Sequence, residues 1–313
     1  MKIAYLFSGQ GGKIEPLDDT LYKNSVQFRQ IFDDASTEFD TDLWQLWASG
    51  DQRLSQTRFA QPAILTLSLA LHSVISKQLP DAVALAGLSL GEYSALIAGK
   101  GLDWPTGFQL ITKRGQLMQD ASEHFPGAMA AVMSQDTDLI ERVCQEVAGE
   151  TGLIVQTANY NYPKQTVIGG EKKAVLLAVG ELHKQGIARI VDLPVSGAFH
   201  TPLMASANQQ FVTELQSAAV SEPEIPVISN TTGQAFTKKT IKETLAKQMV
   251  QATRFTDCLL QMGGLGVTTV IELGPGHSLT SFAKKTLKLE GYYAVSDADS
   301  LNAAVSALNS VSN

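Results

Sequence analysis

One short segment of the chain combines the features that a serine nucleophile requires. The residues Gly87-Leu88-Ser89-Leu90-Gly91 fit the pattern G-x-S-x-G, with an apolar run before them and a helical pattern after them. Small flanking residues allow a sharp turn from strand to helix, which would project the Ser89 hydroxyl beyond the strand end. The Leu90 amide would then lie at a helix N-terminus, where it could stabilise an oxyanion. A purely structural turn is the alternative, but the strand–turn–helix context favours a nucleophile.

A serine hydroxyl needs a neighbouring base before it can act as a nucleophile. The chain offers five histidines, which are His72, His124, His183, His200 and His277. His200 lies in residues 194–202, a segment that follows a predicted strand and is rich in small residues. Sheets of α/β proteins place their sites in loops at strand ends. A lone histidine is more often structural, so it is this position that makes His200 the best candidate base.

Two further features could contact an anionic group. Arg114 lies in the second half of a helix predicted over residues 105–122. It is either a solvated or ion-paired surface residue or a guanidinium that binds a carboxylate with two hydrogen bonds, and the spacing does not decide. The loop Gly9-Gln10-Gly11-Gly12 follows the first predicted strand and could donate backbone amides to an anion or oxyanion. It lacks the full G-x-G-x-x-G pattern and the acidic residue of a dinucleotide site.

The elements that must position these residues alternate between short apolar runs and helical patterns. This alternation predicts βα units and a parallel sheet. We predict strands over residues 2–7, 82–88, 226–229 and 269–272, and helices over residues 61–77, 89–98 and 105–122.

The middle of the chain has a different order of elements. We predict strands over residues 127–133, 153–159, 165–169 and 188–193, helices over residues 137–147 and 172–185, and a turn over residues 159–164. This β-α-β-β-α-β order is the split βαβ pattern, and its length suits a small domain. We therefore expect residues 125–195 to form a subdomain inserted into a larger α/β domain made of residues 1–124 and 196–313.

Composition excludes several classes of function. The net charge is −7, and no concentrated basic face is evident, which argues against a nucleic-acid-binding protein. No segment is long and apolar enough to span a bilayer. The two cysteines, Cys144 and Cys258, have no CxxC or cysteine–histidine spacing, so we expect buried thiols, no zinc site and a reducing, cytoplasmic setting.

Several motifs, taken in order over nearly the whole chain, resemble those of the malonyl-CoA:acyl carrier protein transacylase family of fatty-acid and polyketide synthesis. They are Phe7-Ser8-Gly9-Gln10-Gly11, Ala60-Gln61-Pro62-Ala63, Gly87-Leu88-Ser89-Leu90-Gly91-Glu92-Tyr93-Ser94-Ala95-Leu96, Lys113-Arg114-Gly115, Gly127-Ala128-Met129-Ala130-Ala131, Asn159-Tyr160-Asn161, Gly197-Ala198-Phe199-His200-Thr201-Pro202-Leu203-Met204 and Glu272-Leu273-Gly274-Pro275-Gly276. Each motif alone is weakly or moderately specific, whereas the ordered set is highly specific.

The resemblance implies a fold and a set of reacting groups. The fold would be a hydrolase-like α/β core with a ferredoxin-like insertion. Ser89 would be the acylated nucleophile, and His200 its general base and later its acid. Gln248 would orient His200 through an amide or carbonyl oxygen. The backbone amides of Gln10 and Leu90 would form the oxyanion hole.

The resemblance also implies the substrates. Malonyl-CoA would acylate the serine, and the phosphopantetheine thiol of acyl carrier protein would take the malonyl group. Arg114 would bind the malonyl carboxylate, and Phe199 would line the pocket and favour an unbranched C2 position. No metal or redox cofactor is expected, because coenzyme A and phosphopantetheine enter as parts of the substrates.

The chain departs from the family pattern at three places. Leu88 stands where many members have histidine, Gly12-Lys13 replaces the usual serine–glutamine, and residues 250–253 lack the common asparagine–proline. The first departure predicts an altered pocket lining.

Two other functions remain open from the sequence. A serine thioesterase or lipase shares G-x-S-x-G but usually orders its triad as serine, acid and histidine, with the histidine near the C-terminus. Here the candidate base is in mid-chain, and Arg114 has no obvious task in a lipase. A non-catalytic scaffold is the second alternative, and the presence of Ser89, His200 and Arg114 together argues against it.

Overall fold

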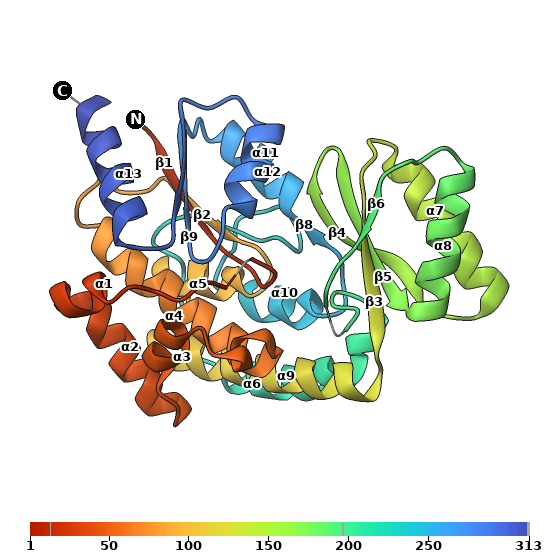
Figure 1. Ribbon diagram of the computed structural model, residues 1–313, viewed down its shortest axis with the longest axis horizontal. Coiled ribbons are helices and arrows are strands. Elements are labelled where there is room, and N and C mark those ends of the chain that lie inside the picture. Colours follow the sequence, from red (N-terminus) through yellow and green to blue (C-terminus); the bar gives the residue numbers. More distant parts are fainter. Residues whose placement is uncertain (13, 196, 312–313) are drawn as a thin grey trace.

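Two five-stranded sheets organise the computed structural model, which describes residues 1–12, 14–195 and 197–311 (Figure 1). The first sheet is parallel and has the order β10 (Gly291–Val295), β9 (Thr269–Leu273), β1 (Ile3–Phe7), β2 (Ala84–Gly87) and β7 (Val227–Ile228). The second has the order β6 (Ile190–Asp192), β3 (Gly127–Val132), β5 (Gln165–Glu171), β4 (Val155–Tyr162) and β8 (Thr253–Arg254). The chain is thus a mixed α/β protein with a parallel sheet, as predicted.

The helices between these strands include several that the sequence pattern did not predict. In chain order they are α1 (Thr20–Asn24), α2 (Val26–Phe39), α3 (Leu43–Ser49), α4 (Thr57–Ile75), α5 (Gly91–Ala98), α6 (Trp104–His124), α7 (Thr137–Thr151), α8 (Lys172–Lys184), α9 (Ala205–Ser217), α10 (Ile241–Gln248), α11 (Phe255–Gly264), α12 (Ser278–Thr286) and α13 (Ala298–Val311). Short 3₁₀ helices cover Gln52–Ser55 and Pro202–Met204.

Strand β1 shows how the first sheet is buried on both faces. All five of its residues are inaccessible or nearly so, as expected for a central parallel strand. Tyr5 and Phe7 belong to the core shared with α4 and α5, whereas Ala4 and Leu6 belong to the core shared with α11 and α12. The alternation follows from the two-residue period of a strand. The strand that leads into the loop at residues 9–12 is therefore covered on both faces.

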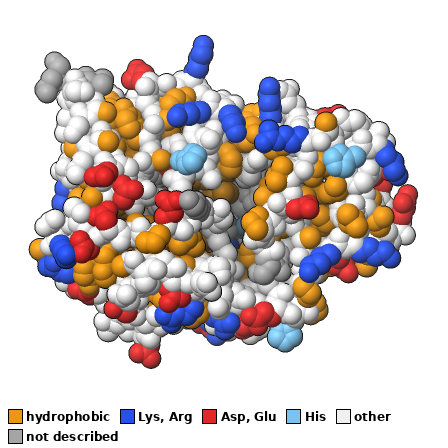
Figure 2. Space-filling view, in the orientation of Figure 1, with side chains coloured by type: hydrophobic (Ala, Val, Ile, Leu, Met, Phe, Trp, Pro, Cys, Tyr) orange, Lys and Arg blue, Asp and Glu red, His pale blue; other side chains and the backbone are white. Residues whose placement is uncertain are grey.

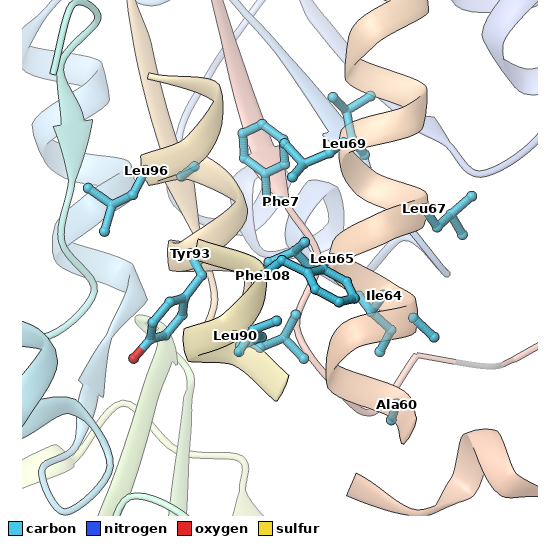
Figure 3. Packing of buried hydrophobic residues seen from close by; sticks show 14 of the residues in the cluster. Phe7, Ala60, Ile64, Leu65, Leu67, Leu69, Leu90, Tyr93, Leu96 and Phe108 are labelled. Atoms are coloured by element: carbon cyan, nitrogen blue, oxygen red, sulfur yellow. The ribbon is translucent and has the colours of Figure 1, made fainter. Parts of the chain in front are cut away.

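The nucleophile segment lies between β2 and α5, where α5 packs against α4 and β1. Leu90 and Leu65 lie close to each other in the packed layer between the two helices, with Phe7 of β1 nearby (Figure 3). Phe108 of α6 completes this group. Burial of these apolar side chains fixes α5 relative to the sheet, and so fixes the turn that precedes it.

The second sheet is antiparallel within residues 127–192, and its strands follow the predicted order β-α-β-β-α-β. Helices α7 and α8 cover its outer side (Figure 1). Strand β8 comes from a much later part of the chain and pairs in parallel with β4. The predicted turn over residues 159–164 is wrong, because β4 continues to Tyr162 through two irregularities and leaves only Pro163-Lys164 as the turn.

Three smaller observations bear on the sequence analysis. Both cysteines, Cys144 and Cys258, are free and buried. Within the described part of the chain, no helix has the length and apolar character needed to cross a membrane. Lys13, from the departure at residues 12–13, lies outside the described residues, as do Ser196 and the last two residues.

Candidate active site

The turn that carries Ser89 is tight and strained. Ser89 has a φ of 54°, which is the left-handed region that non-glycine residues rarely adopt. A Cβ at position 87 would lie 2.0 Å from the Gly91 carbonyl carbon, and one at Gly91 would lie 2.1 Å from the Phe7 carbonyl oxygen. Only glycine fits at either position, which explains the G-x-S-x-G spacing. The turn thus holds the Ser89 side chain at the C-terminal end of β2.

His200 meets Ser89 directly. Its Nε2 lies 2.8 Å from Ser89 Oγ, and its Nδ1 lies 2.7 Å from the backbone oxygen of Gln248. A carbonyl oxygen only accepts hydrogen bonds, so Nδ1 carries the proton and Nε2 presents its lone pair to the serine hydroxyl. Like Ser89, His200 has a positive φ, here 61°. The pair therefore has the arrangement of a nucleophile and its general base.

The burial of His200 keeps its imidazole neutral. The side chain is 3% exposed, and this burial, together with the positive charge of Arg114, lowers the pKa of His200 to about 4. A histidine that is neutral at physiological pH can accept a proton, which is what a general base requires.

Leu90 and Gln10 both line the cavity in front of Ser89. The amides of Gly91, Glu92 and Tyr93 bond to the carbonyls three residues earlier. Leu90 caps the N-terminus of α5, and its amide is the one at this helix end that, among the described residues, has no such carbonyl partner. Gln10, from the glycine loop after β1, lines the same cavity, and its side-chain amide donates to Thr57 Oγ1 at 3.2 Å.

Arg114 is fully buried and belongs to this cluster. Its Nη2 donates to Ser89 Oγ at 3.1 Å and to Gln248 Oε1 at 3.0 Å, and its Nη1 donates to Gln61 Oε1 at 2.7 Å. Its Nε has no hydrogen-bond partner among the described residues. Burial lowers the pKa of the Arg114 guanidinium, yet arginine stays protonated in proteins. The surface-residue interpretation of Arg114 is thus wrong, because it is buried beside the candidate nucleophile.

A second buried ionisable group contacts this cluster. Glu92 is 0% exposed, and its two oxygens accept hydrogen bonds from the Asn230 backbone amide and from Gln248 Nε2. Burial raises the pKa of Glu92 to about 7, and hydrogen bonds from Ser229, Asn230 and Gln248 act in the opposite direction.

Sequence reasoning assigned no role to Glu92 or to Gln61, although both lie within quoted motifs. The sequence did contain a signal for Glu92. In the α5 segment GEYSALIA it is the one acidic residue among side chains that are apolar or uncharged. Gln61 offered no such signal, since a glutamine near the start of a helix is ordinary.

A cavity of about 220 Å³ opens in front of these groups, between the two sheets. Figure 2 shows a recess on the face viewed there, between the two parts of the molecule. Ser89, His200, Leu88 and Phe199 line the cavity, and Phe199 is 9% exposed. Side chains of the second sheet also line it. On the second sheet these side chains are Met129, Ala131, Asn159, Asn161, Gln165 and Val167.

The other histidines take no part in this cluster. His72 packs against the rings of Tyr5 and Phe7, His183 contacts the Ile187 carbonyl within the second sheet's outer layer, and His277 caps the N-terminus of α12. His124 is exposed at the end of α6. Across residues 1–12, 14–195 and 197–311, no group of three or more histidine, cysteine or acidic side chains is placed to hold a metal ion.

Nearly the whole chain matches a known protein family. Residues 4–305 match the acyl transferase domain family. The chain is 37% identical over 309 residues to the malonyl CoA-acyl carrier protein transacylase of Bacillus subtilis (strain 168), covering 98% of this chain and 97% of that protein.

Solved structures give the same result for the fold. The crystal structure of MCAT from Streptococcus pneumoniae has a TM-score of 0.93 and 36% identity, covering 98% of this chain and 100% of that one. A malonyl-transacylase solved in complex with its type II PKS acyl-carrier protein has a TM-score of 0.92 and 32% identity, covering 98% and 100%. This chain therefore belongs to the acyl transferase domain family, among the malonyl CoA-acyl carrier protein transacylases.

Proposed function

We propose that this protein transfers a malonyl group from malonyl-CoA to the phosphopantetheine thiol of an acyl carrier protein, in fatty-acid or polyketide synthesis. The observation that carries the proposal is that Ser89 Oγ contacts a neutral histidine and a buried guanidinium at the same time. A hydrolase of neutral acyl groups needs the histidine but has no use for the guanidinium. The thioesterase alternative is therefore not favoured.

The first half-reaction acylates Ser89. His200 Nε2 accepts the hydroxyl proton while Oγ forms a bond to the thioester carbonyl carbon. The amides of Leu90 and Gln10 stabilise the negative charge that develops on the carbonyl oxygen. The carbon–sulfur bond then breaks, and His200 returns its proton to the departing coenzyme A sulfur.

The second half-reaction runs the same steps in reverse with a different thiol. The phosphopantetheine thiol gives its proton to His200, and its sulfur bonds to the carbonyl carbon of malonyl-serine. The bond to Ser89 Oγ breaks as His200 returns the proton to it. Gln248 holds the imidazole in the required tautomer throughout, through its backbone oxygen. All proton transfers are thus assigned to residues of this chain, and the proposal includes no metal or redox cofactor.

Arg114 is proposed to select the malonyl group. Burying a carboxylate is unfavourable unless a cation and hydrogen bonds replace its water, and a guanidinium supplies both. In the structure Arg114 donates to three neutral oxygens and leaves Nε without a partner, so donors are available for a carboxylate. Phe199, at the cavity wall, is proposed to favour an unbranched C2 position.

We also propose how the chain divides. Residues 1–124 and 196–313 would form a hydrolase-like α/β domain, and residues 125–195 a ferredoxin-like subdomain inserted into it. In support, the strands of the second sheet from residues 127–192 have the order β6-β3-β5-β4, with two helices on one side. The free cysteines support a proposed cytoplasmic location, where thiols stay reduced.

Intact-protein mass spectrometry after mixing with malonyl-CoA tests the function. We expect one malonyl group per chain, which disappears when holo acyl carrier protein is added and reappears on the carrier. Acetyl-CoA at the same concentration should give much less adduct. Release of free malonate at the same rate with and without the carrier would instead identify a thioesterase.

A further inference from the structure

Gln248 connects four groups of the site, three through its side chain and one through its backbone. Its Nε2 donates to Glu92 and, at 3.0 Å, to the Ser89 carbonyl oxygen, and its Oε1 accepts from Arg114 Nη2 at 3.0 Å. Its backbone oxygen meets His200. We propose that Glu92 is a positioning residue that fixes the orientation of the Gln248 amide and, through it, the Arg114 guanidinium that selects the malonyl group. This inference rests on the proposed malonyl transfer.

The buried position of Glu92 indicates that its carboxylate serves as a hydrogen-bond acceptor within the site. It is the second residue of α5, three residues after Ser89, and none of its surface is exposed. A buried carboxylate is strongly unfavourable unless donors replace its water. Both of its oxygens have a donor, the Asn230 amide at 2.7 Å on Oε1 and Gln248 Nε2 on Oε2. Neither of these two donors can accept a proton from the carboxyl group, and a hydrogen bond from the Ser229 side chain also favours the ionised form.

These contacts leave the Gln248 amide one orientation. Its nitrogen faces two acceptors, Glu92 Oε2 and the Ser89 carbonyl, and its oxygen faces a donor, Arg114 Nη2. Rotating the amide by 180° would place its oxygen against the carboxylate and its nitrogen against the guanidinium. Both new contacts would be repulsive. Glu92, together with the Ser89 carbonyl, thus determines which end of the amide is presented to Arg114.

Arg114 depends on that orientation because its other neighbours are neutral. Within the part of the chain that the structure describes, no carboxylate forms an ion pair with its guanidinium. Its hydrogen-bond acceptors are the oxygens of Gln61, Gln248 and Ser89, and the Tyr93 ring centroid lies 5.6 Å away. The charge of Glu92 also acts on the guanidinium directly, and the Gln248 amide is hydrogen-bonded to both groups. A change at Glu92 should therefore displace the cation that binds the malonyl carboxylate.

Glu92→Gln isolates this role, because the side chain keeps its size. A glutamine at position 92 has one acceptor for two donors, so its NH₂ must face either the Asn230 amide or Gln248 Nε2. The Gln248 amide can turn to relieve the second conflict, but it then presents its NH₂ to Arg114. In both cases a buried donor loses its acceptor.

The test measures acylation of Ser89 by malonyl-CoA and by acetyl-CoA at pH 8, using intact mass. Glu92→Gln should lower the malonyl-to-acetyl ratio of kcat/KM by roughly 10- to 100-fold, the range for losing a hydrogen bond to a charged group. The matched control is Glu38→Gln, the same change at an exposed residue, which should leave the ratio unchanged. Equal losses with both substrates would mean that Glu92 only supports the fold, and would overturn the inference.

A second variant keeps the test decisive if Glu92→Gln alone does not fold. Gln248→Met removes the side-chain amide and keeps the backbone oxygen that meets His200. It should lower the ratio by a similar factor. In Glu92→Gln/Gln248→Met the two NH₂ groups no longer oppose each other, so this chain should fold. Its ratio should lie within about threefold of that of Gln248→Met, because both changes act through one amide.

Two other outcomes separate this inference from the proposed function. Multiplicative losses in the double variant would show that Glu92 does not act through Gln248, and would overturn the inference. A wild-type chain that takes no malonyl group from malonyl-CoA would overturn the proposed function itself. A wild-type chain that is malonylated, with an unchanged ratio in Glu92→Gln, would overturn the positioning role alone.

Discussion

The two sheets contribute to the cavity in different ways. The first sheet places Ser89 and Gln10 in loops at its strand ends, and the tight glycine contacts beside Ser89 allow almost no freedom of backbone. The second sheet contributes side chains on its strands, such as Met129 and Asn161, which form a wall. Backbone geometry thus fixes the positions of the reacting groups, whereas the shape of the wall is determined by side chains. Changes at the first sheet should therefore affect the chemical step, and changes at the second should affect substrate binding.

The largest effect is expected at the nucleophile. Ser89→Ala should abolish the malonyl adduct, because no other described hydroxyl contacts His200 Nε2. The fold should persist, since alanine removes one oxygen from a turn that the backbone defines. Intact mass with malonyl-CoA measures the adduct, and circular dichroism checks the fold. An adduct that persists at full yield in Ser89→Ala would place the nucleophile elsewhere.

Removal of the base should have the next largest effect. His200→Ala should lower the rate of acylation by ~10²- to 10⁴-fold, the usual range for loss of a general base. His183→Ala is the matched control on the second sheet's side, since His183 contacts only the Ile187 carbonyl among the described groups. Stopped-flow mixing with malonyl-CoA gives both rates. A comparable loss of rate in His183→Ala would mean that the chemical step does not depend specifically on the first sheet's side.

Arg114 tests whether selectivity also belongs to the first sheet's side. Arg114→Ala should weaken malonyl transfer by about 3–5 kcal/mol, as removal of one partner of a buried charge pair does. Acetyl transfer should fall little or rise. Arg114→Lys should rescue only in part, because an ammonium lacks the two-pronged geometry. Steady-state transfer from both thioesters measures the effect, and equal losses would mean that Arg114 supports the fold instead of binding malonate.

A smaller effect is expected on the wall. Asn161 is 7% exposed, its Nδ2 donates to Gln165 at 2.9 Å, and its Oδ1 has no partner among the described residues. Asn161→Ala should raise the KM for malonyl-CoA by roughly 2- to 10-fold, the value of one ordinary hydrogen bond, and change kcat little. Steady-state kinetics separates the two constants. A large fall in kcat with constant KM would mean that Asn161 acts in the chemical step instead of in substrate binding.

The smallest expected change is in the charge of His200 between pH 8 and pH 6. Burial and Arg114 lower its pKa to about 4, so the neutral form is kept as pH falls through the range where an ordinary histidine titrates. Nitrogen NMR of ¹⁵N-histidine-labelled protein, assigned with His200→Gln, measures this directly. Protonation of His200 near pH 6.5 would show that the site is more open to water than its burial indicates.

The sequence predicted the parts of this site that depend on neighbouring residues. The turn at Ser89 follows from five consecutive residues and the flanking patterns, and the structure has it there. The position of Arg114 could not be decided, because a buried and a solvated arginine occupy the same helical spacing. Gln61 and Glu92 acquire their contacts across 53 and 138 residues, and no local pattern encodes such distances.

The same reasoning explains the errors in the fold. Helix α4 begins at Thr57, four residues before the predicted start at residue 61, since the boundary depends on a contact of the Thr57 amide with Gln119 in α6. Strand β8 has two residues and no pattern of its own. It is a strand only because β4 offers a free edge, and that edge exists only in the folded chain.

Strand β8 connects the wall of the cavity with the segment that contacts the base His200. It lies five residues after Gln248 and pairs with β4, where Asn159 Nδ2 donates to Thr253 Oγ1 at 2.7 Å. The same short segment is tied to the first sheet's side, because the Arg254 amide donates to the Asn230 carbonyl. Any tilt of the wall when a long thioester enters would pull on the chain that carries the carbonyl partner of His200. The substrate wall and the carbonyl partner of the base are therefore joined by one short stretch of chain.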